Sequence, residues 1–367
     1  MKIAIYIHCL IGGGAERVTV NLATELVERG HDITIVLNKE IIDYKLDKRI
    51  HLSVMPVLKD YSGYNIIRRV CYSIYNHFYE YKGVKNSLED IKPDIIIASW
   101  GCKLWALLIN HQQIPIVASE HNTFERKHTF KEIINRFFLN RFCDKVVVLT
   151  KYDKMYVKNY LKNTIVIPNP LSYKPITHDE NECFFSQRKN FLACGRINAY
   201  MVKGFDTLII AYSRIASHHP DWDLDIVGAG SEHNIEYLKS LAAIHNIEDR
   251  VHFLGFSEHV DLEMKKHAVF ILSSRSEGFG MVITEAMAMG CPCISFSLTG
   301  PREIIHNGKD GILVENQNID ELSKEMSRLA LDASLRYELS KNALDSVNRF
   351  LPSTITDRWL NLFNEIL

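Results

Sequence analysis

The feature that most constrains the fold is a series of short apolar runs, each the length of one buried strand. In the first half they lie at 2–9, 32–37, 95–98, 116–119 and 146–149. Runs that are apolar on both faces are typical of strands inside a parallel sheet. Between the first two runs, Val18, Leu22 and Leu26 recur at helical spacing, and further helix-like segments separate the later runs. This alternation predicts a doubly wound α/β sheet.

The pattern breaks at Pro168-Asn169-Pro170 and then restarts. Two prolines in three residues disfavour both a helix and a central strand. The second series of apolar runs lies at 191–194, 224–227, 252–254, 270–272 and 293–296, with a helical pattern over 204–216. We therefore expect two facing doubly wound domains of α/β class, 1–170 and 171–352. An amphipathic helix at 353–367 is expected to pack back on the first domain. Ligands bind at the carboxyl ends of such strands, so the facing domains should share a cleft.

Composition excludes several other classes of protein. The chain has 367 residues, of which 47% are hydrophobic and 24% charged, which are ordinary values for a globular protein. No apolar run approaches the roughly 20 residues of a membrane-spanning helix. The eight cysteines are scattered without C-x-x-C or zinc-ligand spacing, and the first residues lack the apolar core of a signal peptide. We expect reduced thiols, no metal site and a cytoplasmic protein.

Charge is unevenly divided along the chain. Residues 1–170 hold 24 Lys and Arg against 17 Asp and Glu, whereas the remainder is net acidic. Such segregation suggests that the first half faces an anionic partner, either a membrane surface or a phosphate-bearing substrate. The alternative is chance together with an acidic surface on the second half. We expect no nucleic-acid partner.

The strongest local signal is the segment 274–287, with the sequence SRSEGFGMVITEAM. We expect a helix to begin near Gly280, where free backbone N–H groups at its amino end would favour a phosphate group. Glu277 lies in the preceding loop and Glu285 inside the helix. The two carboxylates could hold hydroxyl groups at different points of one extended ligand.

A second signal joins the run at 191–194 to the next helix. Arg196 follows Gly195, and Lys203 precedes Gly204. A guanidinium can grip phosphate oxygens through two donors, and an ammonium adds a point charge. This pair could neutralise a diphosphate and stabilise it as a leaving group.

With three further motifs, these signals give the chain a resemblance to a known enzyme family. The further motifs are 12–16 (GGGAE), 119–122 (SEHN) and 166–170 (VIPNP). Together with Arg196, Lys203 and the E-x7-E pattern of Glu277 and Glu285, the chain resembles the retaining family 4 glycosyltransferases of the GT-B fold. These enzymes transfer sugars from nucleotide donors. Residues 13–18 and the Ser-Glu-His triplet are most similar to bacterial enzymes that extend undecaprenyl-diphosphate-linked oligosaccharides in O-antigen, capsule or protein-glycan synthesis.

The resemblance implies a catalytic group of four residues. Arg196 and Lys203 would hold the diphosphate of a UDP-sugar. Glu277 would hold the transferred sugar, and His121 would reach that sugar's far edge.

The resemblance also implies contacts to the rest of the donor and to the acceptor. Glu285 would hold the ribose hydroxyls, and the nucleobase would lie near 252–255. The other residues expected at the donor are Phe279, Gly280, Met281, Leu254 and Gly228. The expected acceptor or diphosphate loop contains Gly13, Gly14 and Glu16, where glycines would allow a close approach to the backbone.

The reaction that the resemblance implies transfers a hexose or N-acetylhexosamine with retention of configuration. Cleavage of the sugar–phosphate bond leaves negative charge on UDP, which Arg196 and Lys203 would stabilise in place of a divalent ion. Because no Asp-x-Asp metal motif is evident, we expect no metal and no other cofactor. Attack is expected on the front face, with the diphosphate accepting the proton of the acceptor hydroxyl.

Two segments of the first domain mix aromatic and basic residues, at 66–79 and 126–145. Amphipathic helices of this kind can lie at an anionic membrane surface. We therefore expect a lipid-diphosphate-linked glycan acceptor and peripheral attachment to the inner face of the cytoplasmic membrane. The alternative is that the aromatic residues pack in a core.

Other functions stay open at this stage. A dehydrogenase is disfavoured because Gly12-Gly13-Gly14 does not form G-x-G-x-x-G and no acidic residue closes the next strand at Leu37-Asn38. A UDP-sugar epimerase of the same fold and a non-catalytic sugar-nucleotide-binding subunit are the remaining alternatives.

Overall fold

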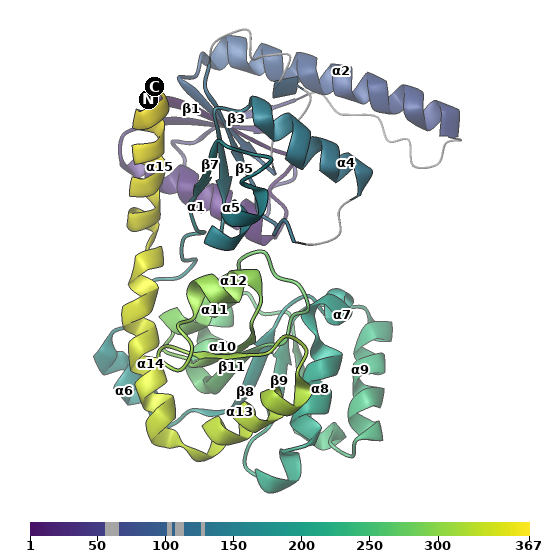
Figure 1. Ribbon diagram of the computed structural model, residues 1–367, viewed down its shortest axis with the longest axis vertical. Helices are drawn as coiled ribbons and strands as arrows, with labels where there is room; N and C mark the ends of the chain where they lie inside the picture. The colour runs from purple at the N-terminus through teal and green to yellow at the C-terminus, as the bar shows by residue number, and fades with distance from the viewer. Residues whose placement is uncertain (56–65, 101–104, 107–113, 126–128) are drawn as a thin grey trace. The chain divides into compact units, whose positions relative to one another are not determined.

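The computed structural model describes residues 1–55, 66–100, 105–106, 114–125 and 129–367 (Figure 1). The chain divides into two compact units. The N-terminal unit contains 1–170 and 352–367, and the C-terminal unit contains 171–351. Each unit has its own parallel sheet and its own buried core.

Within the described residues, the N-terminal unit has a seven-stranded parallel sheet in the order β3-β2-β1-β4-β5-β6-β7. The strands are β1 (Lys2–Ile7), β2 (Asp32–Leu37), β3 (His51–Val54), β4 (Ile95–Ser99), β5 (Ile116–Ser119), β6 (Lys145–Val148) and β7 (Thr164–Val166). The chain runs outward from β1 to β3 and then returns to the other side of β1 at β4. The strand order therefore reverses between β1 and β4, which is where parallel sheets of this kind open a crevice for ligands.

Helices cover both faces of this sheet. They are α1 (Gly14–Glu28), α2 (Ile66–Ile91), α4 (Phe130–Ile133), a π-helical turn η2 (Ile134–Phe138), a 3-10 turn η3 (Leu139–Phe142), α5 (Lys151–Val157) and α15 (Pro352–Ile366). The C-terminal helix α15 lies beside α1 (Figure 1) and buries Trp359 and Phe363 in the same core as the sheet. Arg29 at the end of α1 donates to the carbonyl of Ser353 at 2.8 Å, which fixes the start of α15.

The C-terminal unit has a six-stranded parallel sheet in the order β10-β9-β8-β11-β12-β13. The strands are β8 (Lys189–Cys194), β9 (Leu224–Val227), β10 (Val251–Gly255), β11 (His267–Leu272), β12 (Cys293–Phe296) and β13 (Ile312–Val314). Here the order reverses between β8 and β11. The buried core contains Phe191, Leu208 and Ile271, from β8, a flanking helix and β11.

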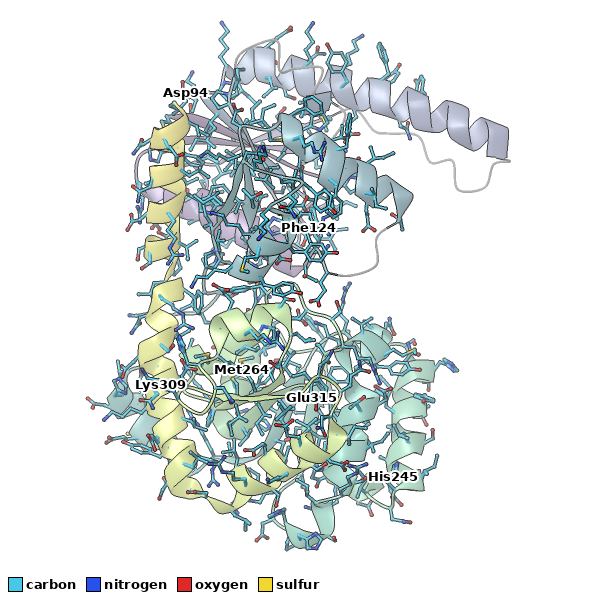
Figure 2. The ribbon with its side chains drawn as sticks, in the orientation of Figure 1. Asp94, Phe124, His245, Met264, Lys309 and Glu315 are labelled. Carbon is cyan, nitrogen blue, oxygen red and sulfur yellow. The ribbon has the colours of Figure 1, made fainter. Side chains whose placement is uncertain are left out.

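The helices of the C-terminal unit flank its sheet on both sides. They are α6 (His178–Phe185), α7 (Tyr200–Lys203), α8 (Phe205–Ser213), α9 (Glu232–Ile244), α10 (Val260–Lys266), α11 (Met281–Ala288), α12 (Thr299–Ile304), α13 (Ile319–Leu331) and α14 (Ala333–Val347). Met264 of α10 and Phe124 of the N-terminal unit, both labelled in Figure 2, are fully buried in their respective units.

The predicted fold class, two doubly wound parallel sheets in one chain, is confirmed. Every apolar run that predicts a strand forms one, and the helix expected near Gly280 begins at Met281. The helical pattern at 204–216 gives a shorter helix, α8, followed by a separate 3-10 turn at Ala216–His218. In the described parts of the chain, no helix combines the length and the apolar composition that a membrane span requires.

Candidate active site

The carboxyl edge of the C-terminal sheet brings together the residues with the strongest sequence signals. Arg196 and Lys203 follow β8, and Glu277 and Glu285 follow β11. Because β8 and β11 are neighbours with their carboxyl ends at the same edge, both segments lie at the point where the strand order reverses. This is the edge at which ligands bind in doubly wound sheets.

Lys203 and Glu277 form an ion pair at this edge. The Nζ atom of Lys203 donates to Oε2 of Glu277 at 3.1 Å, and the two side chains are 22% and 15% exposed. Partial burial weakens solvent screening, so the pair holds both side chains in place more firmly than a pair in open water would. From the sequence, Lys203 and Glu277 were expected to have separate roles. In the structure the two side chains contact each other directly.

The backbone around Gly204 is what places Lys203 beside the loop after β11. Gly204 separates α7 from α8 with φ +67, and a Cβ atom there would overlap the carbonyl oxygen of Ser273. Ser273 in turn donates through Oγ to the carbonyl of Lys203 at 2.9 Å. Only glycine allows this left-handed conformation and this close approach together.

Arg275, in the loop after β11, also connects that loop to the segment around Gly204. Its guanidinium donates to both carboxylate oxygens of Asp206 at 2.8 Å and to Oγ1 of Thr207 at 2.7 Å. Its backbone N–H donates to the carbonyl of Val202 at 2.8 Å. Hydrogen bonding to Asp206 raises the pKa of Arg275. This positioning role of Arg275 was not predicted from the sequence, although an arginine within a predicted ligand loop was a visible signal.

Arg196 has a different environment from Lys203. It is exposed and directly precedes a 3-10 turn at Ile197–Ala199. In the described part of the chain, its guanidinium makes no hydrogen bond or ion pair, so all its donors are available to a ligand. The structure thus places two cations at a single edge: Arg196, which has no partner among the described residues, and Lys203, which is paired with a carboxylate.

The loop after β11 ends at the amino terminus of α11. Gly280 has φ +95 directly before Met281, and Phe279 is buried. A Cβ atom at Gly300, near the start of α12, would overlap the carbonyl oxygen of Phe279, so the two helix starts pack closely. Glu285 is 4% exposed on α11. The structure therefore places Phe279, Gly280, Met281 and Glu285 on one short segment, with Glu285 largely shielded from solvent.

The remaining donor residues lie further along the same edge. A Cβ atom at Gly228 would overlap the carbonyl oxygen of Gly195, so this glycine allows β8 and β9 to end close together. Leu254 of β10 is exposed. The neighbouring His252 contacts Asp223 at 3.2 Å. Asp223 precedes β9, so the His252 side chain points to the amino end of the sheet. The nucleobase position near 252–255 stays a prediction.

The carboxyl edge of the N-terminal sheet contains the glycine-rich loop after β1. The N–H of Gly12 donates to Oδ2 of Asp43 at 2.9 Å, and the N–H of Gly13 donates to the hydroxyl of Tyr44 at 2.9 Å. A Cβ atom at Gly13 would overlap Oε2 of Glu16. The Glu16 carboxylate therefore lies directly beside Gly13, and the expected acceptor or diphosphate role of this loop stays a prediction. Gly14 begins α1.

His121 lies two residues beyond β5, at the same edge. Its Nε2 atom is 3.4 Å from Oγ of Ser119, and its Nδ1 atom is buried with no hydrogen-bond partner among the residues that the structure describes. Burial lowers the pKa of His121 to about 4. The imidazole is therefore neutral at neutral pH. It can accept one hydrogen bond from an uncharged hydroxyl or donate one to it.

The segment from Glu120 to Phe124 is held by a buried arginine. Arg136 donates through Nε to Glu120 at 2.8 Å, and its other nitrogens donate to the carbonyls of Asn122 and Thr123. Its guanidinium lies 3.8 Å from the centre of the Phe124 ring. Arg136 was expected at a membrane surface within 126–145; this expectation is wrong, because its charge is neutralised inside the fold.

Elsewhere in the two aromatic–basic segments, some aromatic side chains pack against the core and others are exposed. Residues 126–128, and the side chains of 66–74, lie outside the described part of the chain. Phe137 packs against the core, whereas Phe138 and Phe142 are exposed and stack edge to face at 5.4 Å. On α2, Phe78 is exposed. Exposed aromatic side chains are thus present in both segments.

The described residues include no group of three or more His, Cys, Asp or Glu side chains arranged to hold a metal ion. The cysteines that the structure describes are free thiols: Cys9, Cys143, Cys183, Cys194, Cys291 and Cys293. Burial raises the pKa of Cys291 to about 12 and also raises the pKa of Cys194 beside Glu285. These thiols are poor nucleophiles at neutral pH.

Two family models match this chain, one in each half. The model of glycosyltransferase family 4 matches residues 12–173, and the model of glycosyl transferases group 1 matches residues 177–345. Together the matches cover most of the chain and both carboxyl edges described above.

Individual relatives and solved structures agree with these matches. An uncharacterized glycosyltransferase of Haemophilus influenzae is 28% identical over 89% of this chain and 90% of its own length. A Campylobacter jejuni enzyme, GalNAc-α-(1→4)-GalNAc-α-(1→3)-diNAcBac-PP-undecaprenol α-1,4-N-acetyl-D-galactosaminyltransferase, is 27% identical over 100% of this chain and 99% of its own. The crystal structure of Anabaena HepE in complex with UDP superimposes with a TM-score of 0.80 at 18% identity, covering 100% of both chains. The first half of this chain therefore matches glycosyltransferase family 4, the second half matches glycosyl transferases group 1, and the chain is a glycosyltransferase with the GT-B fold.

Proposed function

We propose that this glycosyltransferase moves a hexose or N-acetylhexosamine from a UDP-sugar to a lipid-linked oligosaccharide or polysaccharide, with retention of configuration and without a metal ion. One observation carries the proposal. Arg196 and the Lys203–Glu277 pair lie together at the point where the C-terminal sheet reverses its strand order. Two cations beside a carboxylate fit a ligand that joins a diphosphate to a polyhydroxylated sugar.

The proposed chemistry follows from charge. The bond between the sugar C1 atom and the β-phosphate oxygen breaks, and C1 forms a bond to the acceptor oxygen on the same face. The acceptor hydroxyl gives its proton to an oxygen of the departing diphosphate. Arg196 and Lys203 stabilise the negative charge that develops on UDP. The neighbouring Glu277 accepts hydrogen bonds from the sugar hydroxyls.

Glu285 is the proposed partner of the ribose hydroxyls. A carboxylate can accept two hydrogen bonds from neighbouring hydroxyls, and burial strengthens both. Met281 and Gly280 precede it at the amino end of α11, where backbone N–H groups favour the phosphates. His121 stays a proposed contact of the transferred sugar, in which its neutral imidazole would bond to a hydroxyl.

The proposed acceptor comes from the family relatives and from the charge of the first half. The Campylobacter relative is named for a diphosphate-linked undecaprenol glycan. Residues 1–170 of this chain carry excess positive charge, and Phe78, Phe138 and Phe142 are exposed on the N-terminal unit. Basic and aromatic side chains together suit an anionic membrane surface. We therefore propose peripheral attachment of the N-terminal unit to the cytoplasmic membrane.

The direct test is UDP release from a panel of UDP-sugars, measured with and without undecaprenyl-diphosphate-linked glycans, in buffer containing EDTA. Acceptor-dependent release supports a transferase. Conversion of the UDP-sugar without any acceptor would indicate an epimerase, and binding without turnover would indicate a non-catalytic subunit. Either outcome would refute the proposal. Proton NMR of the product shows whether the anomeric configuration is retained.

A further inference from the structure

Trp100 is an exposed tryptophan at the carboxyl edge of the N-terminal sheet. It directly follows β4, the strand at which the order of this sheet reverses. Its side chain is 40% exposed, whereas Trp105 and Trp359 are buried. A large aromatic ring left in solvent at a ligand-binding edge is unusual, because burying such a ring is strongly favourable.

The backbone of Trp100 adds a second observation. Its φ is +69, in the left-handed region that bulky residues rarely adopt. This conformation is strained for a bulky residue and persists only where the surroundings impose it. Strained residues of this kind cluster at ligand-binding sites. The surroundings therefore impose the backbone conformation that Trp100 adopts at the edge of the sheet.

The neighbours of Trp100 show what the ring faces. Ser99 is paired with Ser119 in the sheet register, so Trp100 and His121 follow adjacent strands. The Trp100 and His121 rings lie 5.6 Å apart between centroids at an angle of 59°. Ser99 also contacts Thr19 of α1 at 3.3 Å, which places the start of α1 near the same point. An apolar ring thus lies beside a neutral histidine.

We propose that Trp100 is the platform on which a sugar ring of the acceptor glycan stacks, while the imidazole of His121 bonds to a hydroxyl of a bound sugar. The C–H face of a pyranose is apolar and packs well on an indole, whereas its edge carries hydroxyls that need polar partners. The proposal rests on the transferase function above. We assign Trp100 to the acceptor because it belongs to the N-terminal unit, whereas the proposed diphosphate-binding residues belong to the C-terminal unit.

A fluorescence measurement tests the site without any turnover. Acrylamide quenching reports mainly on Trp100, because the other tryptophans are buried or, for Trp222, packed against Phe191 and Arg336. The probes are the methyl α-glycosides of galactose, glucose, GalNAc and GlcNAc, with glycerol as the solvent control. We expect at least one glycoside to reduce quenching in the wild type. The reduction should disappear in Trp100→Phe and persist in the matched variant Trp222→Phe.

Kinetics with an acceptor that the enzyme uses provide the second readout. Trp100→Ala should raise the acceptor KM about 10-fold, as expected for loss of one aromatic contact. Trp100→Phe should recover most of that loss, since it keeps an aromatic face. The dissociation constant of UDP should stay within about twofold of the wild type, because the diphosphate site is in the other unit.

Several outcomes would overturn the proposal. Absence of protection by every glycoside would do so, as would equal protection in Trp100→Phe. Protection by UDP-sugars alone would assign Trp100 to the donor instead. Glycoside protection in a protein that releases no UDP would leave the Trp100 site standing and refute the transferase function, so the two failures are distinguishable.

Discussion

The ammonium of Lys203, the last residue of α7, lies 3.1 Å from the carboxylate of Glu277, which is 74 residues further along the chain. The pair has a direct consequence for donor binding. A diphosphate must compete with Glu277 for Lys203, while Arg196 has no such competitor among the described residues. Glu277 thereby holds Lys203 at the edge of the sheet before the donor arrives.

Substitutions of the two partners should move UDP affinity in opposite directions. Lys203→Met removes the proposed charged hydrogen bond to the diphosphate, of a kind worth about 1.5–3 kcal/mol, so we expect UDP to bind about 10- to 100-fold more weakly. Glu277→Gln removes the competitor, so UDP should bind as tightly as in the wild type or more tightly while transfer falls. Isothermal titration calorimetry measures both. The control is Lys189→Met, an exposed lysine at the amino end of β8. Weaker UDP binding in Glu277→Gln would contradict this account.

Gly204→Ala should destabilise the C-terminal unit severely. The alanine Cβ atom would overlap the carbonyl of Ser273, adding about 1–3 kcal/mol of overpacking to about 1–2 kcal/mol of left-handed strain. Gly308→Ala is the matched control, since Gly308 has φ +74 but no atom within 4 Å of such a Cβ. Chemical denaturation measures the unfolding free energy of both variants. Equal losses of unfolding free energy in both variants would show that close approach to Ser273 is unimportant.

His121 should make folding stability depend on pH below neutrality. The folded pKa is about 4 and the unfolded value is 6.5, so the unfolded chain binds a proton in this window that the folded chain does not. Stability is full above pH 6.5 and is lost as the pH falls towards 4, by at most about 3 kcal/mol.

In His121→Gln this part of the pH dependence should be absent. Denaturation curves of wild type and variant between pH 4 and 7 provide the measurement, with His245→Gln as the control for loss of an exposed histidine. Parallel curves for wild type and His121→Gln would show that the pKa of His121 is the same in the folded and unfolded chains.

Substitutions of Arg136 and Arg141 should differ strongly in their effect on folding stability, although both residues lie in one aromatic–basic segment. Arg136→Leu leaves the buried Glu120 carboxylate without its cation, which typically costs about 3–5 kcal/mol. Arg141 is exposed and donates to the carbonyl of Tyr160, so Arg141→Leu should cost less than about 1 kcal/mol. Urea denaturation measures both. Similar small losses would mean that Arg136 is not a structural residue.

Much of the fold could be predicted because the strands of a parallel sheet are buried on both faces. Ile95–Ser99 is a continuous apolar run for that reason, and its position was predictable. The strand β3 (His51–Val54) was missed because it lies at the edge of the sheet and leaves Leu52 and Val54 exposed. The short strand β13 was missed because its three residues lack a distinct pattern.

The candidate site could be predicted in part. Motif order identified Arg196, Lys203, Glu277 and Glu285, because strand–loop–helix junctions are visible in a sequence. Contacts between distant segments are not visible, so neither the Lys203–Glu277 pair nor the burial of Arg136 was foreseen. Trp100 was overlooked because its importance depends on a backbone angle and on the His121 ring beside it.

The central claim is that Arg196 and Lys203 bind the diphosphate of the donor. A crystal structure of the protein with UDP, grown in the presence of EDTA, tests it most directly. We predict diphosphate oxygens within hydrogen-bonding distance of both the Arg196 guanidinium and the Lys203 ammonium, with the ribose hydroxyls on Glu285. A UDP molecule bound away from both cations would contradict the account.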